Sequence, residues 1–147
     1  MFYFNLNFIM KEEGKVTRIP EEDRNILEQA IYLPMVLTIL NRDLAVINKS
    51  SFKLPQPYIN LIEETMKVIQ KELTTIKFYM SKNKLKVQQL KRDEAFTMFL
   101  FLYKGYEEQH NYFNPRIRNK VQELMDYYLY KRHMNGYIKS TRSQGLL

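Results

Sequence analysis

A long stripe of apolar residues at helical spacing, between residues 58 and 80, constrains the fold more than any other feature of the sequence. Its members are Tyr58, Leu61, Ile62, Met66, Ile69, Leu73, Ile76, Tyr79 and Met80. Lys67, Lys71 and Lys77 fall away from this stripe. The pattern predicts one amphipathic helix with an apolar face toward a core and a basic face toward solvent. We favour this core helix over a helix that lies on a membrane surface.

A second long helix is predicted before this one. Pro20 fits the first helical position, and the three acids that follow it favour the positive end of a helix. Apolar residues then recur at helical spacing from Leu27 to Ile47 and keep their phase across Pro34. We expect one helix with a kink just before Pro34, because proline removes a backbone donor and clashes with the preceding turn. The two prolines within residues 50–57 indicate a loop between the two helices.

The periodicity changes from helical to alternating after residue 83. Residues 84–89 alternate in the manner of a strand, residues 91–94 form a polar break, and residues 96–103 are dense in aromatic and branched side chains. This pattern predicts a β-hairpin over residues 84–103. A short buried helix is the alternative for the second half, because a continuous apolar run fits both structures.

The last predicted helix has the clearest start. Asn114 can cap it, and Pro115 fits its first turn. Its buried stripe consists of Ile117, Val121, Leu124, Met125 and Tyr128. Asn135 and Gly136 provide a natural stop.

These elements together predict a mostly helical α+β domain of the order helix–helix–β-hairpin–helix, with an all-α bundle as the alternative. We expect a single domain over residues 1–147. Residues 1–10 alternate like a strand, and because Met10 offers a second start they are alternatively a non-native N-terminal extension. Residues 137–147 are polar and are expected to form a flexible tail.

The chain contains no cysteine. This excludes a disulfide framework, thiolate metal sites and a cysteine nucleophile, and it suits a reducing cytoplasm. No unbroken apolar run approaches the roughly 20 residues that span a bilayer. We therefore expect a cytoplasmic protein without a membrane partner.

The net charge of +7 is concentrated in two segments. Residues 67–92 hold eight bases and one acid, and residues 114–147 hold seven bases and two acids. Such a footprint suits a polyanion or an acidic protein surface, and a face that only promotes solubility is the alternative.

Tyrosines near the end of the last helix add to this basic segment. Tyr127, Tyr128 and Tyr130 cover different sides of a helix, so at least one of them should be exposed beside arginine, as in many recognition surfaces. A tyrosine that packs its ring and wets its hydroxyl is the alternative. The candidate binding residues are therefore Arg116, Arg118, Lys120, Tyr127, Tyr130, Lys131, Arg132, Lys67, Lys71 and Lys77.

No motif points to catalysis. Glu107 and His110 have a spacing that can bind metal on a helix, but the pair occurs once and the segment is predicted to be a turn. The glycines are isolated, so no phosphate-binding loop is present, and no serine lies in a Gly-x-Ser-x-Gly elbow. We therefore predict no catalytic residue, no metal and no cofactor.

Three segments resemble a group of small uncharacterised proteins of phages and prophages of Gram-positive bacteria, over roughly residues 18–131. The segments are Ile19-Pro20-Glu21-Glu22-Asp23, Leu33-Pro34-Met35-Val36-Leu37-Thr38 and Tyr112-Phe113-Asn114-Pro115-Arg116-Ile117-Arg118-Asn119. The resemblance implies a bacterial cytoplasm and a phage context.

We accordingly expect a non-enzymatic accessory protein that binds a macromolecular partner, either a host protein or a phage protein. A nucleic-acid-binding regulator that uses a basic helical face is the alternative, since Arg116, Arg118 and Lys120 lie in the first turns of the last helix. A homodimer is a further option for the partner, and an enzyme of unrecognised type ranks last.

Overall fold

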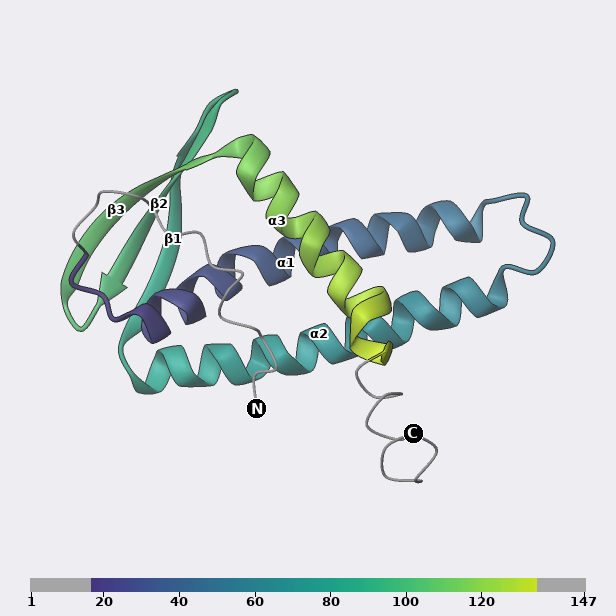
Figure 1. Ribbon diagram of the computed structural model, residues 1–147, viewed down its shortest axis with the longest axis horizontal. Coiled ribbons are helices and arrows are strands. Elements are labelled where there is room, and N and C mark those ends of the chain that lie inside the picture. Colours follow the sequence, from purple (N-terminus) through teal and green to yellow (C-terminus); the bar gives the residue numbers. More distant parts are fainter. Residues whose placement is uncertain (1–16, 135–147) are drawn as a thin grey trace.

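The computed structural model describes residues 17–134 (Figure 1). The strand or extension predicted over residues 1–10, the helix stop at Asn135 and Gly136, and the tail over residues 137–147 lie outside the described residues. The elements follow the order α1 (Glu21–Asn48), α2 (Gln56–Lys82), β1 (Leu85–Arg92), β2 (Phe96–Tyr103), β3 (Tyr106–Phe113), α3 (Asn114–Asp126) and the π-helical turn η2 (Tyr127–Lys131). The prediction of a helix–helix–hairpin–helix α+β domain is confirmed, and the all-α alternative is wrong.

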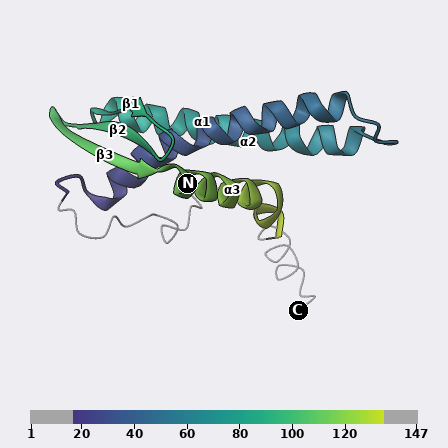
Figure 2. The same cartoon turned by 90° about the horizontal axis from the view of Figure 1, so that it is seen from above.

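Helices α1 and α2 run side by side in opposite directions and project beyond the other elements as a two-helix arm (Figures 1 and 2). Helix α1 continues through Pro34, which confirms a single helix, and the Thr38 hydroxyl donates to the Pro34 carbonyl at 2.9 Å. The kink before Pro34 stays a prediction. The apolar stripe of α2 supplies buried Ile62, Ile69 and Ile76, so the amphipathic reading of this helix is also confirmed.

The predicted hairpin is present as β1 and β2, but the sheet has a third strand that the sequence did not predict. Strand β3 pairs antiparallel with β2, so the segment from Glu107 to His110 is strand and not turn. Lys104 and Gly105 connect these strands, and their φ angles of 48° and 83° are those of a tight two-residue hairpin turn. Such turns usually carry Asn-Gly or Asp-Gly, so Lys104 concealed the signal.

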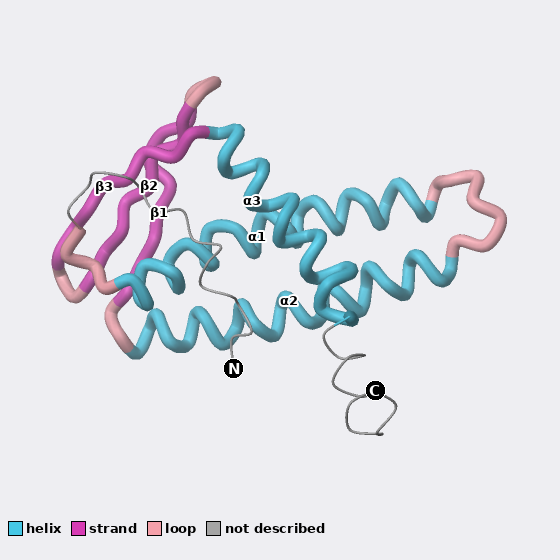
Figure 3. Tube along the Cα trace, in the orientation of Figure 1, coloured by secondary structure: helices cyan, strands magenta, loops and turns pink. Residues whose placement is uncertain are grey.

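One face of the sheet packs against the helices and is called the inner sheet face here. It carries Phe99 and Phe101 from β2, and His110 and Tyr112 from β3, all of which are buried. Helix α1 contacts α2, α3 and β1, so it lies at the centre of the molecule. Figure 3 shows the sheet at the end of the helix pair that is opposite the connecting loop.

Asn114 begins α3 but does not cap it with its side chain, so that prediction is wrong. Its amide donates to the carbonyls of Asp93 and Glu94 at 2.9 and 3.1 Å, and it accepts from the Thr97 hydroxyl at 2.6 Å. Helix α3 follows β3 without a loop, which brings Asn114 beside the β1–β2 turn. The side chain thereby fastens that turn to the start of α3.

Among the described residues, one helix is long and apolar enough to cross a membrane by length and composition. It is α1, whose most apolar 18-residue window has a mean hydropathy of 1.5. The expectation of no membrane partner was based on the length of unbroken apolar runs. Polar residues interrupt α1, so that criterion did not select it. Of that 18-residue window, 28% is buried, and a single helix of this kind is weak evidence for a membrane.

Candidate partner-binding site

Large apolar side chains are exposed together at the free end of the arm, which is called the arm tip here. They are Val46, Phe52, Leu54, Tyr58 and Leu61. The most exposed are Leu54 at 73% and Val46 at 67%. Helix α3 crosses the pair nearer the sheet, so it does not cover this end (Figure 1). The arm tip is therefore an apolar surface without a partner among the described residues.

Local hydrogen bonds hold the arm tip in shape. The Ser50 hydroxyl donates to the Ile47 carbonyl at 2.6 Å, and the Tyr58 amide donates to the Pro55 carbonyl at 3.1 Å. The rings of Phe52 and Tyr58 are 5.3 Å apart. The two hydrogen bonds lie where the connecting loop leaves α1 and where it enters α2, and the ring contact joins the loop to α2.

The arm tip carries positive charge as well as apolar surface. Residues 49–57 contain Lys49 and Lys53 and no acid. Both lysines are exposed. An apolar centre with a charged rim is the usual anatomy of a protein-binding surface.

The basic residues predicted at the start of α3 do not act as one group. Arg116 and Arg118 are exposed, but Lys120 is buried. Lys120 lies on the face of α3 that also carries buried Ile117 and Leu124, and its amine is 3.5 Å from the Glu123 carboxylate. Lys120 therefore does not belong to the exposed surface that its charge suggested.

The basic residues predicted at the end of α3 are already paired with acids. The Lys131 amine is 3.2 Å from the Asp126 carboxylate. The Arg132 guanidinium donates to both oxygens of Glu64, at 2.8 and 3.3 Å, which joins η2 to α2 and lowers the pKa of the Glu64 carboxyl. Their charges are thus largely balanced in place.

The neighbouring tyrosines divide between core and solvent. Tyr128 is buried, Tyr127 is half-buried and packs edge-on against it, and Tyr130 is 60% exposed. This confirms that the three rings cannot share one face. Tyr130 is the most exposed of the three and therefore the one best placed to contact a partner.

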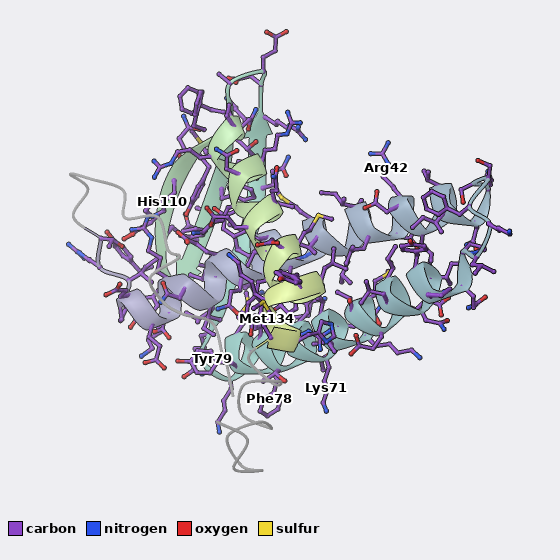
Figure 4. The ribbon with its side chains drawn as sticks, turned by 45° about the vertical axis from the view of Figure 1, so that its right-hand side comes forward. Arg42, Lys71, Phe78, Tyr79, His110 and Met134 are labelled. Carbon is purple, nitrogen blue, oxygen red and sulfur yellow. The ribbon has the colours of Figure 1, made fainter. Side chains whose placement is uncertain are left out.

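A row of exposed residues along α2 is called the lysine strip here. It consists of Lys67, Lys71, Thr74, Phe78 and Lys82, whose spacing of four, three, four and four residues keeps them on one side of a helix. Phe78 is 70% exposed between the lysines, and Figure 4 shows it pointing away from the body in the same direction as Lys71. Lys77 is exposed but lies off the strip. The predicted residues Lys67 and Lys71 are therefore brought together on α2. Arg116 and Arg118 lie in the first turns of α3, at the end away from η2, which is the part that contacts α2.

A buried polar cluster near the start of α1 was missed by the sequence analysis. Glu28 is 2% exposed, its carboxylate is 3.4 Å from the Arg24 guanidinium, and the Tyr112 hydroxyl donates to it at 3.0 Å. Burial raises the pKa of the Glu28 carboxyl. The hydrogen bond from Tyr112 and the charges of Arg24 and Lys120 lower this pKa, but burial has the larger effect. Arg24 and Glu28 are four residues apart, which was the available signal for an ion pair on one helix face.

The described residues offer no metal centre, since none of their histidines and acids gather in groups of three or more. His110 lies on the inner sheet face against Phe101, with ring centroids 4.8 Å apart. Glu107 is three residues away on the same strand and therefore points to the opposite face. An open groove of about 300 Å³ between α1 and the sheet is lined by residues such as Pro34 and Val87, with no ionisable group.

Comparisons with known proteins give a family for this chain. Residues 18–133 match the family described as "YhjD protein". The chain is 48% identical, over 112 residues, to "Uncharacterized protein YhjD" of Bacillus subtilis (strain 168), which covers 76% of this chain and 93% of that protein. No solved structure matches. The relative comes from a Gram-positive bacterium, as the resemblance implied, and neither finding shows a phage or prophage origin.

Proposed function

The chain belongs to the YhjD protein family, and we propose that it is a non-enzymatic accessory protein whose arm tip binds another protein. The exposed apolar cluster at the arm tip carries this proposal. A few residues near the centre of an interface usually supply most of its binding energy, and tyrosine is among the types enriched there. Because Lys49 and Lys53 flank the cluster, the partner should present an apolar pocket with acidic groups at its rim.

We propose a bacterial cytoplasm as the setting of this function. The Gram-positive relative and the absence of cysteine support action in a bacterial cytoplasm. A phage or prophage origin would make a host protein the natural target. The groove beside Pro34 is lined by no acid and no base, and its Thr38 hydroxyl donates to the Pro34 carbonyl at 2.9 Å without a base to activate it, which supports binding over catalysis.

The test compares capture by the intact chain and by an arm-tip variant, F52S/L54S, in a Bacillus subtilis extract. We expect a protein that the intact chain captures to lose at least about 30-fold in affinity for the variant, which corresponds to about 2 kcal/mol. The melting temperature should not change much, because surface substitutions usually stay within about 0.5 kcal/mol. Binding constants are then measured with the purified partner.

The matched control is Phe78→Ser, which removes an aromatic ring that is 70% exposed, against 53% for Phe52, and lies far from the arm tip. It should leave the captured protein and its affinity unchanged. If F52S/L54S retains the same partner at the same affinity, the proposed function is wrong.

The lysine strip supports nucleic-acid binding as a second candidate. It combines three lysines with an exposed aromatic ring, the combination that tracks a phosphate backbone and stacks on bases. We expect K67Q/K71Q to reduce the slope of log affinity against log salt concentration by about 2, roughly one unit for each lysine. Mobility-shift titrations at several salt concentrations measure this slope, with Lys77→Gln as the control off the strip. Equal slopes for the variant and the intact chain would eliminate this candidate.

A further inference from the structure

The second face of the sheet, called the outer sheet face here, does not have the composition of a solvated surface. The central strand β2 places Phe96, Met98, Leu100 and Leu102 on it, opposite the inner Phe99 and Phe101. A strand that is apolar on both faces is typical of a sheet covered on both sides. In an antiparallel sheet with one solvated face, apolar and polar residues alternate along each strand. The described helices lie on the inner side, where α1 and the sheet line a common groove.

The two edge strands give the outer sheet face a charge pattern arranged in rows. The first row runs from Lys86 on β1 through Leu102 to Glu107 on β3. The second row runs from Gln88 through Leu100 to Gln109 in the same way. The third row contains Lys91, Met98 and Asn111. The fourth row contains Phe96 and Phe113, whose rings are 5.5 Å apart. The face is thus basic along β1, apolar along β2, and acidic or amide-bearing along β3.

We propose that the outer sheet face binds the outer sheet face of a second copy of this chain. A twofold axis that lies between the two sheets and runs parallel to β2 places β1 of one copy over β3 of the other. Each row of one copy then faces the same row of the second copy. Lys86 then faces Glu107 of the partner subunit, and Gln88 faces Gln109 of the partner subunit. The apolar side chains of the two central strands meet between these flanks. Such a self-complementary patch is what a twofold dimer requires, and aligned sheets pack about 10 Å apart.

Charge complementarity is the reason to choose a second copy over another occupant. A chain with a net charge of +7 repels its own kind unless opposite charges meet locally, and the row from Lys86 to Glu107 supplies that match. The acid on the β3 flank also disfavours nucleic acid. Three strands of eight residues offer roughly 14 Å by 27 Å, so the interface is small and dissociation is expected at micromolar concentrations.

Sedimentation equilibrium of the full chain over a concentration series tests this proposal. The intact chain should dimerise, and K86E or E107K should each weaken the dimer by about tenfold, since either substitution places like charges opposite each other twice. The double variant K86E/E107K should recover to within about threefold of the intact chain, because the swapped charges attract again. Leu100→Glu, which places a charge at the apolar centre, should abolish dimerisation.

Lys77→Glu is the matched control for K86E, since it makes the same change of charge at an exposed site of α2. It should leave the dimer unchanged. At concentrations well below the dimer's dissociation constant, the melting temperatures of the single charge variants should match that of the intact chain. A monomer at every concentration would overturn the proposal and leave another protein or the chain's own N-terminal residues as the occupant. Failure of the charge swap to restore the dimer, or an equal loss with Lys77→Glu, would also overturn it. These results are independent of the arm tip.

Discussion

Replacement of Glu28 with alanine is expected to lower the free energy of unfolding by about 3–5 kcal/mol, the usual cost of breaking a buried ion pair. Glu28 is 2% exposed and is the acceptor for the buried Tyr112 hydroxyl at 3.0 Å. Its carboxylate also balances the buried charges of Arg24, 3.4 Å away, and of Lys120. The alanine variant removes the acceptor and this counter-charge together and leaves a cavity beside the sheet.

Glu28→Gln separates these contributions and serves as the control. The amide keeps the shape of the side chain and an oxygen for Tyr112 but removes the counter-charge to Arg24 as alanine does. This variant should therefore lose about 1–3 kcal/mol less than Glu28→Ala, the usual cost of leaving a buried donor without an acceptor. Urea unfolding at constant pH measures both variants through their midpoints and slopes. A Glu28→Ala variant within about 1 kcal/mol of the intact chain would show that the cluster contributes little to stability.

The raised pKa of Glu28 also predicts how this difference changes with pH. Burial disfavours the charged carboxylate, so the folded chain binds this proton more tightly than the unfolded chain does. The stability contributed by protonated Glu28 is fully present below the unfolded pKa of about 4.3 and is lost as the pH rises through the folded pKa. The stability of the intact chain relative to Glu28→Gln should therefore be highest at low pH and fall toward neutral pH.

Local periodicity was sufficient to predict the two long helices and the hairpin. The phase of the apolar residues across Pro34 correctly predicted one helix, because a proline in mid-helix need not shift the register of the turns. Strand β3 was missed because its inner positions hold His110 and Tyr112 in place of the usual aliphatic residues. Its turn has Lys104 at a positive φ angle that lysine rarely takes, so Gly105 stood without the Asn or Asp that usually marks such a turn.

The candidate surfaces were less predictable than the fold, since they depend on which element covers which part of a helix. Charge alone placed Arg132 among the binding residues, but its partner Glu64 is far away in sequence and is met only where η2 packs on α2. The assignment of Lys120 to the binding surface could have been avoided from the sequence, because Lys120 falls between Ile117 and Leu124 on the buried face of the helix. Tyr58 was assigned to the core stripe, but α2 extends past the last covering element at that point.

Replacement of Tyr128 with alanine is expected to cost about 3–5 kcal/mol, as for other large aromatic side chains removed from a core. Tyr128 is fully buried in the π-helical turn, and its hydroxyl donates to the Glu72 carboxylate of α2. Burial raises the pKa of the Glu72 carboxyl, so this acid depends on the hydroxyl as one of the groups that compensate its charge. Tyr128→Phe keeps the ring and removes only that donor, so we expect a loss of about 1–3 kcal/mol.

Tyr130→Phe is the matched control, because it removes a hydroxyl from a ring that is 60% exposed two residues away. It should change the free energy of unfolding by less than about 0.5 kcal/mol. Hydrogen exchange adds a test of position: loss of the Tyr128–Glu72 bond should reduce protection first in the end of α3 and in η2, with the sheet retained. Equal stability of Tyr128→Phe and Tyr130→Phe would show that the hydrogen bond to Glu72 does not fasten α3 to α2. In that case the Arg132–Glu64 ion pair and the packing of the Tyr128 ring would have to hold the helix end in place.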